Sequence, residues 1–188
     1  SVGEDASTKE IRTALAMGAD RGVLVETDAD LDSDAVARLI AEVVKKEEPD
    51  IILMGKQAVD SDRNQAGQML AAYLGWPQAT FAFDLDIDGE WATVGREVDG
   101  GTSTKRVKLP AIVTADLRLN EARYASLPGI IKAKRKKIER FTPEDLGVDI
   151  AAKVNVLNYE APPEREAGQI VEDVDELITK LREEAKAF

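Results

Sequence analysis

The spacing of apolar positions over residues 1–77 changes from one segment to the next. Three segments carry apolar residues at the three- and four-residue intervals of an amphipathic helix. Two shorter segments between them are uninterrupted apolar runs, which are typical of parallel strands covered on both faces. The expected helices lie at 7–17, 32–46 and 64–74, and the expected strands at 23–25 and 51–54. This order predicts an α/β fold with an open, mostly parallel, Rossmann-like sheet.

The pattern becomes alternating after Pro77. Two alternating segments flank a turn at 88–89, and a third follows a turn at 99–101. Together they predict a β-meander, inserted as a hairpin extension, over residues 79–109. A further apolar run at 111–115 predicts another central strand.

The rest of the chain is less regular. Residues 118–141 lack a clean period and are expected to form a loop and a short helix. Prolines and glycines between 142 and 168 indicate an extended segment. A final amphipathic helix begins at Asp173 and packs either on its own domain or on a partner. We therefore expect an α/β domain over 1–141 and a C-terminal arm with a helix over 142–188.

Composition excludes several classes of function. The 188 residues include 36 Asp and Glu against 25 Lys and Arg, and the net charge of −11 opposes binding to nucleic acid. The sequence contains neither Cys nor His, which excludes disulfides, thiolate metal sites and the Ser–His–Asp triad. Any catalysis would have to use carboxylates, Lys, Tyr or hydroxyl groups, and we single out no catalytic residue and no metal site.

Apolar runs and the start of the sequence indicate where in the cell the protein is located. No apolar run reaches the roughly 18–20 residues of a membrane span, and no signal-peptide pattern opens the chain. We expect an intracellular protein that is not secreted and does not insert into a membrane. The sequence begins Ser1-Val2-Gly3, in what resembles the exit of a strand, and we expect N-terminal sequence to be missing.

The loop at 55–67 is the first candidate site, because it follows a buried parallel strand at the end where α/β sheets bind ligands. If Asp62 is the N-cap of the next helix, free backbone N–H groups face the loop and can hold a phosphate. Gly67 would let the backbone approach a ligand, whereas the carboxylates of Asp60 and Asp62 oppose an anion. An ordinary capped helix explains the pattern equally well. The amides expected to be free are those of Asn64, Gln65 and Ala66.

The second candidate site is the segment 114–137. Leu127 and Pro128 form an apolar point, and a basic run over 132–137 follows in an otherwise acidic chain. Such a run is usually a solvated helix face. It is also what a docking element needs, with an apolar anchor and charges that attract a partner.

Segment 114–137, TADLRLNEARYASLPGIIKAKRKK, resembles a signature of the β (small) subunit of electron transfer flavoprotein. The segments GKQAVDSDRNQAGQMLA (55–71), LGWPQATFA (74–82) and REVDGG (96–101) resemble the same family, and the similarity covers essentially the whole chain. The residues that depart from the signature are Ala122, Ser126, Gly129, Ile131 and Arg135.

The resemblance implies a fold like that of the adenine nucleotide α-hydrolases and a heterodimer with an α subunit that holds most contacts to FAD. The β subunit would bind AMP in a structural role. The flavin would accept electrons from acyl-CoA dehydrogenases and related flavoprotein dehydrogenases and pass them to a membrane-associated electron transfer flavoprotein–quinone oxidoreductase. The location implied is the cytoplasm of a bacterium or the mitochondrial matrix of a eukaryote.

The resemblance also implies roles for single residues. A partner-recognition loop corresponds to 124–134, with Leu127 as the anchor that enters a dehydrogenase pocket, and Glu97 corresponds to a contact with the flavin-carrying domain. Ala66 stands where the family usually has Thr, so a hydroxyl bond to phosphate is lost. The docking residues implied are Tyr124, Leu127, Pro128, Ile131 and Lys132. The AMP-binding residues implied are Ala58, Asp62, Asn64, Gln65, Ala66 and Gly67.

Three alternatives remain open. Bifurcating members of the family carry a second FAD in place of AMP, although the loop here is more similar to the AMP-binding group. A nucleotide α-hydrolase or adenylating enzyme would share the sheet but needs a Gly-rich phosphate loop, which we do not find. A nucleotide-binding regulatory domain would make segment 118–137 an ordinary surface loop.

Overall fold

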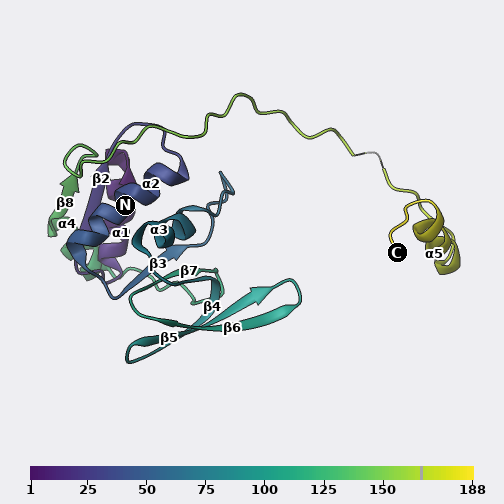
Figure 1. Ribbon diagram of the computed structural model, residues 1–188, viewed down its shortest axis with the longest axis horizontal. Coiled ribbons are helices and arrows are strands. Elements are labelled where there is room, and N and C mark those ends of the chain that lie inside the picture. The colour runs from purple at the N-terminus through teal and green to yellow at the C-terminus, as the bar shows by residue number, and fades with distance from the viewer. Residues whose placement is uncertain (166) are drawn as a thin grey trace. The chain divides into compact units, whose positions relative to one another are not determined.

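The structure is a computed structural model that describes residues 1–165 and 167–188 (Figure 1). Contacts divide the chain into two compact units, 1–155 and 156–188. The strands of the first unit are β1 Val2–Gly3, β2 Gly22–Glu26, β3 Ile51–Gly55, β4 Gln78–Asp88, β5 Trp91–Val98, β6 Gly101–Lys108, β7 Ala111–Ala115 and β8 Ile138–Phe141. Its helices are α1 Thr8–Ala16, α2 Ser33–Glu47, α3 Ala66–Leu74 and α4 Leu127–Arg135, and α5 Val174–Glu183 lies in the second unit.

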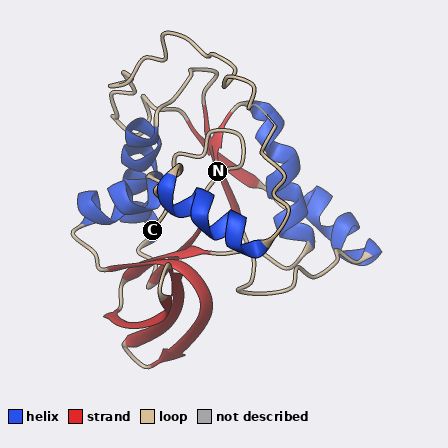
Figure 2. Ribbon diagram, turned by 90° about the vertical axis from the view of Figure 1, so that its right-hand side faces the viewer, coloured by secondary structure: helices blue, strands red, loops and turns tan. Residues whose placement is uncertain are grey.

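The parallel strands lie in two open sheets. One has the order β1-β2-β8 and is parallel throughout. The other has the order β3-β7-β4-β5-β6, with parallel pairing from β3 to β4 and antiparallel pairing from β4 to β6. Figure 2 shows the long strands of the meander curving away from the helices. The predicted α/β class, its mostly parallel sheets and the inserted meander are confirmed.

Each of the two sheets is covered by its own pair of helices. Helices α2 and α3 cover the β3–β7 region, where Ala41, Leu70 and Ile112 are among the buried residues. Helices α1 and α4 pack on β2 and β8, and Leu15 and Ala133 are buried there. In the larger sheet, the parallel strands β3, β7 and β4 have their carboxyl ends at the same edge, while α4 lies on the other sheet (Figure 1).

Two local predictions are wrong. The spacing of Ser7-Thr8-Lys9-Glu10 predicts a capping box, but Ser7 adopts helical angles (φ −61°, ψ −12°), ends the 3-10 turn Asp5–Ser7 and makes no side-chain cap hydrogen bond. Strand β3 is not covered on both faces, since Leu53 is 55% exposed. It is also an edge strand, with β7 as its neighbour in the sheet order. The first error comes from a local 3-10 turn and the second from tertiary packing, and residue spacing specifies neither.

Residues 118–141 contain more structure than the expected loop and short helix. Strand β8 pairs in parallel with β2, and its Ile138 is buried while Glu139 and Arg140 are exposed. The chain then continues into the core, where Leu146 packs with Val25 and Leu39.

The second unit contains α5. Asp173 caps this helix by accepting the N–H of Glu176 at 2.8 Å, as its sequence predicts. Its apolar stripe is partly exposed, with Val174 at 68%, Leu177 at 42% and Ile178 at 39%.

Candidate functional site

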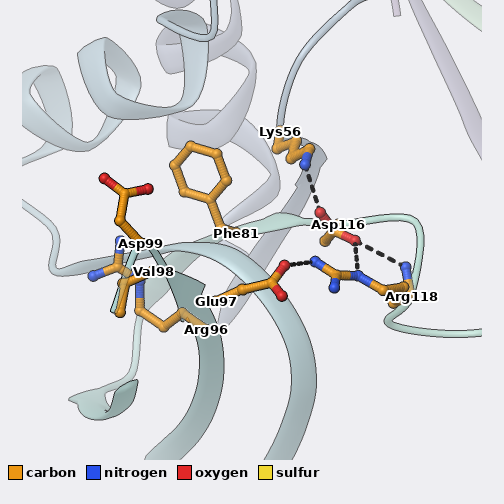
Figure 3. Close-up of a pocket in the computed structure, with 8 residues that line it drawn as sticks. All are labelled: Lys56, Phe81, Arg96, Glu97, Val98, Asp99, Asp116 and Arg118. Atoms are coloured by element: carbon orange, nitrogen blue, oxygen red, sulfur yellow. Dashed lines mark hydrogen bonds and ion pairs between the residues drawn. The ribbon is translucent and has the colours of Figure 1, made fainter. Parts of the chain in front are cut away.

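A cavity of about 550 Å³ lies at the carboxyl ends of β3 and β7, beside β4 and β5 (Figure 3). Open α/β sheets bind their ligands at this end of the strands. The cavity is polar on one side and carries one aromatic ring. Its lining residues are Lys56, Phe81, Arg96, Glu97, Val98, Asp99, Asp116 and Arg118.

Asp116 is the buried centre of the cavity's ion-pair network. Its side chain is 4% exposed and accepts the Lys56 Nζ at 2.5 Å and the Arg118 Nε at 2.9 Å. The backbone N–H of Arg118 also donates to Asp116, at 3.1 Å. These hydrogen bonds, chiefly those from Arg118 and then from Lys56, hold the pKa of Asp116 well below its usual range. Asp116 is therefore a fixed anion and not a proton donor at neutral pH.

Arg118 links Asp116 to Glu97 at the cavity rim. Figure 3 shows its guanidinium between the two carboxylates, with Nη2 bonded to Glu97. The Arg118 and Glu97 side chains are both 53% exposed. Hydrogen bonding to Arg118 lowers the pKa of Glu97, and the two carboxylates raise the pKa of Arg118. Glu97, which the resemblance assigns to a contact with the flavin domain, thus lies at an accessible rim and already has a partner within the chain.

Phe81 adopts an unusual backbone conformation in this cavity. Its φ is +61°, a left-handed value that is uncommon for a bulky residue and that coincides with irregular pairing of β4. The Thr114 hydroxyl stabilises the kink by accepting the Phe81 N–H at 3.2 Å. The Lys56 Nζ lies 5.4 Å from the Phe81 ring centroid. Non-glycine residues in such conformations cluster at functional sites.

Sequence reasoning did not identify the Lys56–Asp116–Arg118 cluster. The available signal was that Lys56 and Asp116 each lie just beyond an apolar run, at residues 51–54 and 111–115, so their side chains meet if the two strands are neighbours. The structure makes them neighbours, because β3 pairs with β7 from Ile51–Ala111 to Gly55–Ala115.

The predicted N-cap at Asp62 is wrong. Helix α3 begins at Ala66, and Gln65 is its N-cap residue. Asp62 has a φ of +53° and its Oδ1 accepts the side-chain amide of Gln57. Asn64 also has a positive φ, of +49°, so the chain turns twice before the helix starts. Because of these turns, the helix begins at Ala66, two residues later than the expected start at Asn64.

The start of α3 nevertheless faces the loop with free amides. The N–H groups in the first turn of a helix have no carbonyl partner within the helix. In α3 these are the N–H groups of Ala66, Gly67 and Gln68. Of the predicted amides at Asn64, Gln65 and Ala66, only that of Ala66 is in this turn.

Gln68 adds a second feature at the same helix start. Its Nε2 donates to the Asn64 Oδ1 at 3.0 Å. Within the described part of the chain, its Oε1 is a buried side-chain acceptor that has no partner. Buried acceptors are almost always satisfied, so this oxygen indicates a missing donor from a bound molecule or water. Sequence reasoning missed Gln68.

Gly67 has a structural explanation. A Cβ at this position would lie 2.7 Å from the Thr114 Cγ2, so glycine lets α3 pack closely on β7. Ala58 lies in the preceding loop, where its carbonyl accepts the Asp62 N–H at 2.9 Å.

The predicted docking residues lie together on an exposed segment that is helical from Leu127. Ser126 caps α4 by accepting the Gly129 N–H at 3.2 Å, and Pro128 lies in the first turn. Tyr124 is 98% exposed, Leu127 71% and Ile131 49%. Pro128 and Lys132 are also exposed. The expected recognition loop over 124–134 is thus a short loop followed by most of a helix.

The fold and this site define an α/β domain of the class that holds ligands at the carboxyl ends of parallel strands. Residues 1–146 match the electron transfer flavoprotein domain. The chain therefore belongs to the electron transfer flavoprotein family and is an electron-carrier subunit of the β type.

Three relatives illustrate the match. The chain is 54% identical over 185 residues to electron transfer flavoprotein subunit beta of Bradyrhizobium diazoefficiens, covering 98% of this chain and 74% of the relative. It is 54% identical over 187 residues to the Homo sapiens subunit, covering 97% of this chain and 73% of the relative. The Arabidopsis thaliana protein "electron transfer flavoprotein subunit beta, mitochondrial" is 52% identical, with 98% and 74% covered. In the described residues, the helices are too short or too polar to cross a membrane.

Proposed function

We propose that the chain scaffolds an FAD-carrying α subunit, binds AMP in a structural role and docks acyl-CoA dehydrogenases for electron transfer to a quinone oxidoreductase. The observation that carries the nucleotide part is the start of α3, where free amides and the unpartnered Gln68 Oε1 lie together beside the β3–β7 edge. In this proposal the chain itself has no catalytic residue.

The donors and acceptors at α3 suit the two polar parts of AMP. The amides of Ala66, Gly67 and Gln68 lie at the positive end of the helix dipole and would hold the phosphate. The Gln68 Oε1 would accept a ribose hydroxyl or a water that the nucleotide orders. Asn64, bonded to Gln68, would fix the orientation of that amide. Asp62 is turned toward Gln57, so Asp62 itself need not contact the phosphate.

The FAD of the heterodimer supplies one- and two-electron redox chemistry when bound. This chain would contribute the surface on which the α subunit rests, with Glu97 at the rim of the polar cavity available to a partner cation. The arm and α5 would supply a second contact. The exposed apolar stripe of α5, which carries Leu177 and Ile178, supports this assignment because such a stripe is stable when covered.

The docking of electron donors would use the segment 124–134. Leu127 lies in the first turn of α4 and is 71% exposed. Tyr124 and Ile131 are also exposed, and a group of exposed apolar side chains such as this one is typical of a protein-binding surface. The last turn of α4 carries Lys132, Lys134 and Arg135. In an acidic protein these cations would attract a complementary partner, while the apolar group would supply the buried contact.

Mass spectrometry of the small molecules released by denaturing the heterodimer tests the nucleotide assignment. One AMP per heterodimer is expected beside FAD. Two FAD molecules would show the bifurcating arrangement instead, and absence of both AMP and a second FAD would overturn the assignment. Gln68→Met is expected to lower AMP retention, whereas the matched variant Gln78→Met, at the exposed start of β4, should retain AMP fully. The proposed location is the cytoplasm of a bacterium or the mitochondrial matrix of a eukaryote.

A further inference from the structure

Helix α4 lies alongside α1 (Figure 1). Two cations, Arg12 and Lys136, join the two helices. Arg12 of α1 donates through Nη1 to the carbonyl of Ala133, at 2.6 Å, and to the carbonyl of Lys136. Both carbonyls lie at the C-terminal end of α4, where a positive charge is favourable. The carbonyl of Ala133 also accepts the backbone N–H of Lys136, at 3.2 Å. Arg12 is therefore a side-chain cap supplied by a neighbouring helix.

Lys136 makes the reciprocal contact. It is the C-cap residue of α4, and its Nζ donates to the carbonyl of Ala19, at 2.5 Å, just beyond the end of α1. A cation from each helix or its cap thus binds backbone carbonyls at or just beyond the C-terminal end of the other helix, and both cations are partly buried. Hydrogen bonds from charged donors are stronger than neutral ones, so this pair resists movement of α4 relative to α1.

Close backbone packing fixes the other end of α4. A Cβ on Gly129, in the first turn, would lie 2.5 Å from the carbonyl oxygen of Ala16. The first turn of α4 therefore lies against the last turn of α1 at a distance that only glycine permits. Between the two ends, Ala133 is 2% exposed and packs with Leu15.

We infer that Arg12 and Lys136 are positioning residues for the docking surface, and that they set its affinity for electron-donating dehydrogenases. This inference rests on the proposed docking function of Leu127. Helix α4 buries few side chains of its own, with Ala133 as its buried residue. The position of its exposed apolar side chains is therefore set mainly by the two cation contacts and the Gly129 approach. Leu127, Ile130 and Ile131 belong to this exposed set.

The test uses the full-length chain in its heterodimer, as the electron acceptor of an acyl-CoA dehydrogenase. Arg12→Gln is expected to raise the KM for the heterodimer about tenfold, because α4 would no longer be held in the position that presents Leu127 and binding would have to order it, and to leave kcat unchanged. Lys136→Met should have the same effect. Combining the two variants should give less than the product of their separate effects, because both act on one helix boundary.

Three controls separate the possible outcomes. Arg21→Gln removes an equal charge from exposed ion pairs with Glu47 and Glu139 and should leave KM unchanged. Gly129→Ala displaces α4 without a change of charge and should raise KM as Arg12→Gln does. Arg12→Lys should restore part of the affinity, because a lysine can still donate to one carbonyl.

Amide hydrogen exchange measures the position of α4 independently of activity. Residues 127–136 should exchange about tenfold faster in Arg12→Gln, with the β3–β7 region unchanged. If Leu127→Ala raises KM but Arg12→Gln does not, the positioning inference is overturned and the docking function stands. If Leu127→Ala leaves KM unchanged with every donor, the docking function is overturned and the inference falls with it.

Discussion

Asp32 accepts the backbone N–H of Lys153 through Oδ2 at 2.7 Å, although the two residues are 121 positions apart. The other carboxylate oxygen, Oδ1, accepts the Ala35 N–H at 2.8 Å and so caps α2. One carboxylate therefore starts a helix and holds the last part of the first compact unit. Asp32→Ala should remove both bonds.

Asp32→Ala is expected to lower the free energy of unfolding by about 1–2 kcal/mol, the usual cost of losing an N-cap. Amide exchange should also rise over residues 149–155. Urea unfolding and exchange mass spectrometry measure the two effects. Asp173→Ala removes the cap of α5 and is the matched control, because it should leave exchange at 149–155 unchanged. Unaltered exchange there in Asp32→Ala would show that Asp32 does not hold this segment.

Acid should weaken the same region. Hydrogen bonds from Tyr73 and Lys153 lower the pKa of Asp34 to about 2, from an ordinary value of 3.8. Because the pKa is lower in the folded state, Asp34 contributes stability above about pH 4, and this contribution is lost as the pH falls toward 2. The urea midpoint should fall over that interval. Asp34→Asn should reduce the slope there, and an equal slope in the variant would contradict the assignment.

Leu127→Ala should separate docking from stability. Because Leu127 is 71% exposed, its truncation should change the free energy of unfolding by less than about 0.5 kcal/mol. Loss of an apolar anchor at a protein interface typically costs about 2 kcal/mol, so the KM with an acyl-CoA dehydrogenase should rise more than tenfold. AMP content should stay constant. Val59→Ala, at a fully exposed apolar residue away from α4, should leave the KM unchanged.

Gly67→Ala should destabilise the start of α3 by steric overlap. The added methyl group would meet the Thr114 Cγ2 at 2.7 Å, and overpacking of this kind costs about 1–3 kcal/mol. Thr114→Ser removes that methyl group and keeps a hydroxyl for the Phe81 N–H. The double variant should therefore recover part of the loss. Equal destabilisation in both backgrounds, measured by urea unfolding, would exclude this contact as the cause.

The sequence predicted those elements whose pattern is strong and local. The apolar runs at 51–54 and 111–115 became β3 and β7, and the alternation after Pro77 became the meander. Strand β8 escaped prediction because its apolar residues Ile138 and Phe141 are separated by two charged residues and directly follow a basic run.

The site was harder to predict because it depends on pairing and on backbone angles. Lys56 and Asp116 are 60 residues apart and meet through the pairing of two strands, which periodicity does not specify. Asp62 has the residue type and spacing of an N-cap, yet its φ of +53° removes it from the helix start. The exposed apolar residues around Leu127 were easier to single out, because their apolar character beside a basic run is visible in the sequence itself, and their role in docking stays a prediction.

Arg118 pairs with two carboxylates, Asp116 and Glu97, so it can lose its contact with Glu97 and still remain paired. If Glu97 turns toward the α subunit, as proposed, the guanidinium of Arg118 would keep its bonds to Asp116. No buried charge would then be left without a partner, because Arg118 and Glu97 are both half-exposed and water can solvate them. The proposed contact at Glu97 would therefore cost little to form or to break.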